Sequence, residues 1–405
     1  MTEISEEFLL AVPKTDLHVH LDGSVRLQTL IELARDCSIE LPSYTEAGLR
    51  ELVFKDQYAS LSEYLRGFSY LVAVLQSEEA LERAAYELGR DNQAEGVRYI
   101  EVRFAPQLHV HHGMDAVTVL SAVNRGLARA KAEFNARREV ETGAEPPFEY
   151  GLICCALRMF RPEFSAYYHA MFDVHRFARA KEIFAMASLE LARSAVVARD
   201  QHGLPVVAFD LAGEEAGYPA GDHVEAFMYC HRNFLKKTVH AGEAYGPESI
   251  FQAITELHAD RIGHGTYLLE ADAITDPSIL DRDRYVRELG EYISDRRITL
   301  EVCLTSNAQT NPQMRDVRRH SFRKMLEARL SATICTDNRT VSNTTVTREL
   351  SKAVRELQMT RRELKSVIIY GFKRSFFPGA YRTKRSYVRG VIDYYESIER
   401  SYLSA

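Results

Sequence analysis

Residues 205–211 read Pro-Val-Val-Ala-Phe-Asp-Leu, a near-continuous apolar run that ends at an acidic residue. Strands covered by helices on both faces have this composition, whereas strands with one wet face alternate between apolar and polar residues. Polar residues follow the run, and a second short apolar run comes at Lys237–Ala241. This stretch therefore predicts a parallel sheet buried between helices.

Eight runs of this kind occur along the chain. They are Thr15–Leu21, Val97–Phe104, Phe148–Leu157, Pro205–Leu211, Lys237–Ala241, Arg261–Gly265, Ile298–Leu304 and Ala332–Thr336. The helical patterns between them include Glu78–Gln93, Ala116–Arg138, Ala178–Asp200 and His320–Arg329. Repeated strand-then-helix units are typical of parallel α/β folds. Eight units favour a closed (β/α)8 TIM barrel, and a doubly wound open sheet is the alternative.

Two segments are longer than a minimal barrel needs. Residues 27–90 carry several helical pieces in the first βα connection, where such insertions often form a lid over the active site. The lid candidates are Phe54, Tyr58, Leu61 and Phe68, and the alternative is that they are ordinary helix-core residues. Residues 351–405 are helical and charged, and we expect them to pack outside the barrel.

No Pro/Gly/Ser-rich linker divides the chain, so residues 1–405 are predicted to form a single domain. Arg137–Pro147 is the best candidate for an exposed loop. The chain is 46% hydrophobic and 27% charged, a balance that supplies enough apolar surface for a large core. Its net charge of −6 leaves no basic stripe to follow phosphates, so we expect no nucleic-acid partner.

The sequence also bears on compartment. Residues 1–7 are acidic and lack the apolar segment of a signal peptide, and no run of about 18 apolar residues predicts a membrane span. None of the six cysteines forms a Cys-x-x-Cys pair, so we interpret them as buried free thiols in a reducing cytoplasm. We therefore expect a cytoplasmic protein with no membrane partner. The oligomeric state is not predicted.

Histidines and carboxylates gather at the ends of these runs, which is the rim where barrels of this type place their active sites. His18 and His20 are two residues apart, so a strand directs both imidazoles to one face. Two neutral imidazoles on one side can share a cation such as zinc. For an isolated His-x-His pair, two polar residues at a strand end are the more common explanation.

Three further strand ends add to this group. His240 comes three residues before Glu243, His264 lies between two glycines, and Asp337 follows an apolar run. Taken singly, these residues fit a surface turn, a loop histidine and a helix N-cap equally well. Taken together, they supply three histidines and one aspartate as ligands, with one glutamate and one histidine to spare. That set matches a catalytic zinc site with an open position for water.

At these residues the sequence resembles the adenosine deaminase family of the metal-dependent amidohydrolase superfamily. The matching motifs are Thr-Asp-Leu-His-Val-His-Leu-Asp-Gly at 15–23, Asp-Leu-Ala-Gly-Glu-Glu at 210–215, His-Ala-Gly-Glu at 240–243, Arg-Ile-Gly-His-Gly at 261–265 and Thr-Asp-Asn at 336–338. They follow the order of the family, and the resemblance covers roughly residues 8 to 350. It implies a hydrolase that removes the 6-amino group of adenosine or deoxyadenosine and releases ammonia.

The resemblance also implies roles for single residues. One zinc ion would be held by His18, His20, His240 and Asp337. Glu243 would donate a proton to purine N1, His264 would orient the attacking water, and Asp337 would accept a proton from that water. The small-molecule substrate, a purine nucleoside, would meet Gly213 at N3, Asp22 and His20 at the ribose 5′-hydroxyl, and Asn338 at N7.

Asn338 departs from the family pattern, in which a second aspartate usually stands at this position. An amide can donate to N7 without a raised pKa, but the change can also alter specificity. The nearest alternative is therefore a deaminase of adenine, a modified adenosine or aminodeoxyfutalosine. An AMP deaminase is less favoured, because only lone residues such as Arg103 or Arg158 could contribute to a phosphate site.

Two alternatives lie outside the deaminases. A two-metal hydrolase of esters or phosphotriesters on this barrel would need a lysine at the end of the fourth strand, and none is present there. A non-catalytic barrel that binds a nucleoside would be expected to have lost a ligand or the acid. All six of His18, His20, His240, Glu243, His264 and Asp337 are present.

Overall fold

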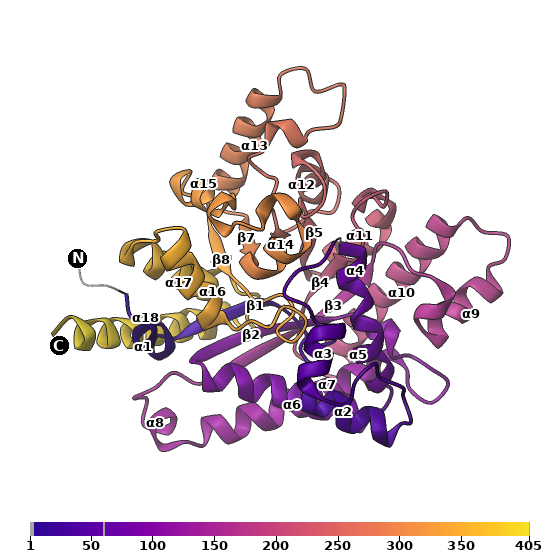
Figure 1. Cartoon of the computed structure of the whole chain (residues 1–405), viewed down its shortest axis with the longest axis horizontal. Coiled ribbons are helices and arrows are strands. Elements are labelled where there is room, and N and C mark those ends of the chain that lie inside the picture. The colour runs from indigo at the N-terminus through magenta and orange to yellow at the C-terminus, as the bar shows by residue number, and fades with distance from the viewer. Residues whose placement is uncertain (1–3, 60, 405) are drawn as a thin grey trace.

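The computed structural model describes residues 4–59 and 61–404, in which eight parallel strands form one sheet in chain order (Figure 1). The strands are β1 (Lys14–His20), β2 (Val97–Phe104), β3 (Glu149–Leu157), β4 (Val206–Ala212), β5 (Lys236–Ala241), β6 (Arg261–His264), β7 (Thr299–Val302) and β8 (Ala332–Ile334). All eight lie within one or two residues of the predicted runs at their starts. Strands β2, β6, β7 and β8 are buried along their whole length, as their apolar composition predicts.

The last strand returns to the first at a bridge between Val19 and Asp337. The Asp337 N–H donates to the His18 carbonyl at 2.8 Å, and the His20 N–H donates to the Asp337 carbonyl at 2.7 Å. Below this bridge, the Thr336 N–H and hydroxyl both donate to the Asp16 carboxylate. The predicted (β/α)8 barrel is confirmed, and this seam between β8 and β1 closes it at the rim.

Helices surround the strands (Figure 1). The α-helices are α1 (Glu6–Ala11), α2 (Leu27–Asp36), α3 (Glu46–Leu52), α4 (Leu61–Arg66), α5 (Phe68–Val74), α6 (Glu78–Ala94), α7 (Ala116–Asn135), α8 (Arg138–Glu141), α9 (Ala166–Val174), α10 (Ala180–Asp200), α11 (Val224–Arg232), α12 (Pro247–Thr255), α13 (Arg282–Arg296), α14 (Leu304–Thr310), α15 (Phe322–Glu327), α16 (Val346–Glu356), α17 (Arg361–Arg374) and α18 (Tyr381–Ser404). Short 3-10 turns are η1 (Pro106–Leu108), η2 (Pro162–Phe164), η3 (Ala220–His223), η4 (Ala271–Ala273), η5 (Pro312–Met314) and η6 (Val317–Arg319).

Side-chain caps fix where several helices begin. The side chains of Ser77, Asp115 and Asp281 accept the backbone N–H three residues further on, at the starts of α6, α7 and α13. The four predicted helical patterns correspond to α6, α7, α10 and α15, with ends shifted by one to three residues. Among the helices within the described residues, none is both long and apolar enough to cross a membrane.

Two expectations about exposure are wrong in part. Arg137–Pro147 is not a plain exposed loop, because α8 forms one turn in it and Glu145 is buried. Glu145 pairs with Arg98 and lies 3.3 Å from Arg137, so the carboxylate is drawn inward. Five of the six cysteines are buried free thiols, as expected, but Cys37 is exposed because it caps the end of α2.

The insertion predicted at 27–90 is helical and comprises α2 to α6. Its role as a lid stays a prediction, as does the division of the chain into one domain. At the other end of the chain, α17 packs across the N-terminal ends of β1 and β8. A Cβ at Gly371 of α17 would collide with the Thr15 hydroxyl and lie 3.0 Å from Thr333 Oγ1. The helix approaches the barrel this closely because Gly371 has no side chain.

This close approach gives a test of the fold. Gly371→Ala is expected to destabilise the protein by about 1–3 kcal/mol, because the added methyl overpacks the α17–barrel contact. The free energy of unfolding in urea measures the effect. Gly390→Ala in α18 is the matched control, since nothing lies within 4 Å of its added Cβ, and it is expected to be neutral or stabilising by up to about 1 kcal/mol. Equal stability of the two variants would contradict this packing.

Candidate active site

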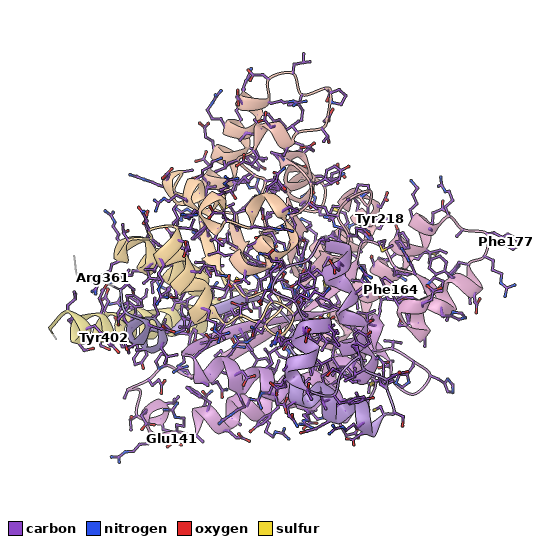
Figure 2. The ribbon with its side chains drawn as sticks, in the orientation of Figure 1. Glu141, Phe164, Phe177, Tyr218, Arg361 and Tyr402 are labelled. Atoms are coloured by element: carbon purple, nitrogen blue, oxygen red, sulfur yellow. The ribbon has the colours of Figure 1, made fainter. Side chains whose placement is uncertain are left out.

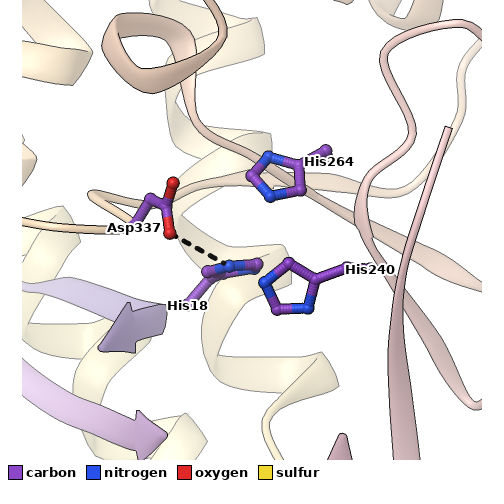
Figure 3. A group of neighbouring side chains, drawn as sticks. All are labelled: His18, His240, His264 and Asp337. Carbon is purple, nitrogen blue, oxygen red and sulfur yellow. Dashed lines mark ion pairs between the residues drawn. The ribbon is translucent and has the colours of Figure 1, made fainter. Parts of the chain in front are cut away.

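Side chains from four parts of the barrel meet at its mouth. Figure 3 shows His18 from β1, His240 from β5, His264 from the end of β6 and Asp337 just after β8. One ligand-type atom from each of these four residues lies within 4.8 Å of the others. His20 belongs to the same group, because its Nε2 lies 3.2 Å from His240 Nε2 and 3.5 Å from Asp337 Oδ1. The structure therefore brings together every residue that the sequence predicts as a metal ligand.

The geometry of these atoms fits a metal ion. His18 Nε2 is buried without a hydrogen-bond partner and lies 3.5 Å from Asp337 Oδ1. Asp337 Oδ2 is occupied by the Ser306 hydroxyl, so Oδ1 is left facing the imidazoles of His18 and His20. Imidazole nitrogen with one carboxylate oxygen is a donor set that transition metals prefer. These residues form a candidate metal site.

A layer of buried ion pairs lies directly beneath the histidines. Arg103 donates to Asp210 at 2.8 Å and to Glu301 at 2.7 Å, and all three side chains are fully buried. Asp210 in turn lies 3.1 Å from His240 Nδ1, and Glu301 lies 2.9 Å from His18 Nδ1. Metal-binding histidines usually hold a carboxylate at the second ring nitrogen, which fixes the tautomer and aims the other nitrogen at the metal.

Arg261 extends this layer downward. It donates to Glu301 Oε1 at 2.6 Å and pairs with Glu101, while its guanidinium lies 3.6 Å from the centre of the Phe376 ring. Burial acts against ionisation here, but Arg103 and Arg261 outweigh it and hold the pKa of Glu301 well below its usual range. The carboxylate that orients His18 is therefore ionised.

Sequence reasoning assigned no role to Arg103 in this layer and none at all to Glu301. The signal was available, because a charged residue inside an apolar strand must find a partner. Arg103 was considered only as a contact for a substrate phosphate, together with Arg158, and this was wrong for both. Arg103 is consumed by its two carboxylates, and Arg158 donates to the carbonyls of Tyr218 and His240, at 2.7 Å each.

Two of the site residues have a strained backbone. His264 has φ of 63° and Asp337 has φ of 62°, in the left-handed region that side chains other than glycine and asparagine rarely adopt. Such residues cost on the order of 1–3 kcal/mol each and cluster at functional sites. Gly213 has φ of 96° at the end of β4, where a side chain would be strained as well. These turns direct the strand ends into the mouth of the barrel.

The proton on His264 is placed by a chain of hydrogen bonds that starts at a backbone donor. The Phe322 N–H donates to His320 Nδ1 at 3.0 Å, and burial lowers the pKa of His320 to about 4, so this ring is neutral with its proton on Nε2. That N–H donates to Asn307 Oδ1 at 3.2 Å. Asn307 Nδ2 is then free to donate to His264 Nδ1 at 3.1 Å. His264 therefore carries its proton on Nε2.

This assignment separates His264 from the ligands. Its Nδ1 accepts from Asn307 and its Nε2 is protonated, so neither nitrogen has a lone pair left for a metal. The Nε2 atom lies 3.7 Å from Glu243 Oε2. His264 is thus a hydrogen-bond donor at the edge of the candidate metal site.

Glu243 is held by a second glutamate. The Glu215 carboxylate accepts four successive backbone N–H groups, from Gly242 to Tyr245, at 2.7 to 3.1 Å, and it also accepts the Ser249 hydroxyl. This fixes the turn after β5 that carries Glu243. Burial, with smaller contributions from the charges of Asp337 and Glu215, raises the pKa of Glu243 well above its usual range.

A pocket of about 590 Å³ opens above these residues. Its inner wall includes the predicted substrate-binding residues His20, Asp22, Gly213 and Asn338. Asp22 Oδ1 is buried with no hydrogen-bond partner, and burial raises the pKa of this carboxyl to about 7. An unpaired polar atom in a pocket wall is a contact point for a ligand.

Helices α4 and α5 of the insertion form one wall of the pocket through Tyr64, Leu65, Phe68 and Val72. Phe68 is therefore placed as a lid candidate should be. Phe54 and Tyr58 are buried in the core instead, and the side chain of Leu61 lies outside the described residues. Across the mouth, Phe164 comes from the connection after β3 (Figure 2).

Tyr64 also explains the position of Asn338. Asn338 Nδ2 donates to the Tyr64 hydroxyl at 2.8 Å, and that hydroxyl is hydrogen-bonded to Ser342 at 2.8 Å. The Asn338 side chain packs against Gly23, where a Cβ would collide with it. The amide therefore links the strand-eight turn to the insertion, which sequence reasoning did not anticipate.

Comparison with known proteins assigns the chain to a family. Residues 13–393 match the family model described as Adenosine deaminase. The chain belongs to the adenosine deaminase family. The resemblance drawn from the motifs is confirmed, and the match extends beyond residue 350 into α18.

Relatives cover nearly the whole chain. An adenosine deaminase of Mycobacterium ulcerans (strain Agy99) is 35% identical over 367 residues, which is 90% of each chain. One of Vibrio atlanticus (strain LGP32) is 32% identical over 369 residues, covering 91% of this chain and 94% of the relative. These proteins, like the family as a whole, are hydrolases acting on carbon–nitrogen bonds.

Solved structures share the fold at lower identity. The adenine deaminase of Arthrobacter aurescens superposes with a TM-score of 0.73 at 22% identity, covering 95% of this chain and 100% of that one. An amidohydrolase of Burkholderia ambifaria with bound Zn gives 0.77 at 19%, covering 100% and 96%. The N6-methyl-AMP deaminase of Arabidopsis thaliana gives 0.70 at 24%, covering 96% and 98%. Their barrels agree with the architecture described above.

The hydrogen-bond chain to His264 can be tested without an activity assay. Asn307→Asp replaces the donor at His264 Nδ1 with an acceptor, so the proton is expected to move from Nε2 to Nδ1. Nitrogen-15 chemical shifts of labelled histidine rings distinguish the two tautomers. Asn311→Asp is the control, because Asn311 contacts the Tyr267 hydroxyl and no histidine. An unchanged His264 tautomer in Asn307→Asp would contradict the assignment.

Proposed function

We propose that this chain is a zinc-dependent enzyme that removes the 6-amino group of adenosine and deoxyadenosine by hydrolysis, producing the inosine nucleoside and ammonia. The observation that carries the proposal is the convergence of His18, His20, His240 and Asp337 with two proton-handling groups, Glu243 and His264, on one pocket of a chain in this family. A non-catalytic barrel would not need the buried acid or the fixed tautomer.

One zinc ion would be held by His18 Nε2, His20 Nε2, His240 Nε2 and Asp337 Oδ1, the four atoms that face one another at the mouth. When bound, zinc lowers the pKa of a coordinated water from about 15.7 to near 7, which makes a nucleophile available at neutral pH. Asp210 and Glu301 hold the His240 and His18 rings so that these nitrogens face inward.

The remaining residues move protons and bind substrate. Glu243, protonated because its pKa is raised, donates to purine N1 and so makes C6 more electrophilic. His264 donates from Nε2 to the incoming water oxygen and stabilises charge there, while Asp337 accepts a proton from that water. Water thereby adds at C6, the C6–N6 bond breaks, and the amino group leaves as ammonia after it has gained a proton.

The pocket favours a substrate with a ribose. Asp22, with its unpaired oxygen and with His20 Nδ1 3.7 Å away, offers a buried partner for a sugar hydroxyl. Gly213 offers a backbone contact to the base edge, and Asn338 lines the same wall. Arg66 and Arg161 also line the pocket but are exposed at its outer part, so AMP belongs in the substrate panel.

The acid and the metal can be tested separately. Glu243→Gln is expected to lower kcat for adenosine by at least about a hundredfold, because it removes the general acid, while zinc content stays near one per chain. His18→Ala should show the opposite pattern first, with zinc content lowered. Metal analysis and ammonia release measure the two effects. Normal turnover in Glu243→Gln would refute the acid role, and full zinc content in His18→Ala would refute the ligand role.

Specificity rests on Asn338 and is tested by adding the charge that the family usually carries. In Asn338→Asp the side chain can donate to N7 only while protonated, so KM for adenosine is expected to rise as pH rises through the pKa of the new acid. The wild-type KM should stay flat over the same range. Asn343→Asp, an exposed position on the same loop, is the control.

The same assay is run on deoxyadenosine, adenine, AMP and aminodeoxyfutalosine. Faster turnover of one of these than of adenosine would move the substrate and keep the chemistry. Identical pH profiles of KM for Asn338→Asp and wild type would show that residue 338 does not contact the base.

A further inference from the structure

A second pocket lies at the opposite end of the barrel from the candidate active site. It has a volume of about 640 Å³ and lies beside Arg297 and Ser331, which come just before β7 and β8 and so mark the N-terminal ends of those strands. We call it the floor pocket. Its lining includes six cationic side chains, from Arg297, Arg329, Lys373, Arg374, Lys384 and Arg385, and no aspartate or glutamate.

These cations are not paired within the chain. Over residues 4–59 and 61–404, none of the six is found in an ion pair. Arg374 Nε is buried without any acceptor, and Lys384 donates only to the Ser375 carbonyl at 2.6 Å. The nearest carboxylate, Glu101, is occupied by Arg261 and by the Phe376 N–H. Six cations thus face one cavity with no counter-charge.

The cations also repel one another. Burial first, and then the charges of Arg261, Arg374 and Lys236, lower the pKa of Lys384 to about 8, against the attraction of Glu101. Burial and the charge of Arg297 likewise lower the pKa of Arg374. Folding therefore assembles this cluster at an electrostatic cost that a bound anion would remove.

Helix dipoles explain only part of the cluster. Arg297, Arg329 and the Lys373–Arg374 pair lie at the C-terminal ends of α13, α15 and α17, where cations are favourable. Lys384 and Arg385 lie in the first turns of α18, where cations are unfavourable and the helix end adds positive partial charge of its own. Residues 364–392 contain seven lysines and arginines and no acid, in a chain whose net charge is −6.

We propose that the floor pocket binds a small polyphosphate-bearing anion, such as a nucleoside triphosphate or inorganic polyphosphate. Arginine and lysine donors are the groups that recognise phosphate oxygens, and the Ser294 and Ser331 hydroxyls add neutral donors to the lining. A ligand with several adjacent negative charges matches several unpaired cations better than a single carboxylate does. The site is a concave pocket and not an extended basic surface, which favours a small molecule over a nucleic acid.

Titration calorimetry with sodium tripolyphosphate on the full chain tests this, at an ionic strength near 0.1 M. Saturable binding at one site per chain is expected. Lys373→Gln/Arg385→Gln, which removes two exposed cations from the pocket, should weaken binding at least about tenfold. The matched control is Arg382→Gln/Arg389→Gln, which removes the same charge from α18 outside the pocket and should change the affinity by less than about threefold.

Three outcomes overturn the proposal. They are the absence of saturable binding, equal weakening in both double variants, which would indicate diffuse attraction, and tighter binding of a single-stranded oligonucleotide that depends on Arg382 and Arg389. Titration with ATP distinguishes the two sources. Equal affinity for ATP and tripolyphosphate would assign recognition to the phosphates alone. Tighter binding of ATP that is lost in Tyr381→Ala would add stacking of the base on an exposed ring in the lining.

Discussion

Arg103 is the charge on which the arrangement of the histidines depends. Its guanidinium holds Asp210 and Glu301, and these two carboxylates hold the rings of His240 and His18. Buried charges are tolerated only when fully paired, and removing one partner leaves the others uncompensated at a cost of several kcal/mol. The position of the candidate metal ligands is therefore set one layer below them, inside the barrel, by groups that touch neither solvent nor substrate.

The mouth of the barrel is built on a different principle. His264 and Asp337 occupy left-handed backbone conformations that their side chains disfavour, and Glu215 uses its whole carboxylate to hold the turn that carries Glu243. The ion-pair layer fixes ring orientation, while these turns fix where each strand end points. Stability is given up at the turns and recovered in the buried layer and the apolar core.

Much of this could be predicted from sequence, for physical reasons. Apolar runs such as 205–211 report burial directly, so the strands and the barrel followed from them. The ligand set followed from residue type at strand ends, together with family motifs. What could not be predicted depends on contacts between distant segments. Examples are Tyr64 bonding Asn338, and the chain from Phe322 to His264, which joins positions that have no sequence pattern in common.

The seam between β8 and β1 has a consequence for how this barrel can change. Asp337 makes both backbone hydrogen bonds that join the two strands at the rim, and its carboxylate is one of the atoms that face the candidate metal. Topology and chemistry are therefore coupled in one residue. A shift in the spacing of the first and last strands alters the coordination distances at the same time, so ring closure acts as a gauge that keeps the ligands in register while the outer helices and the floor diverge.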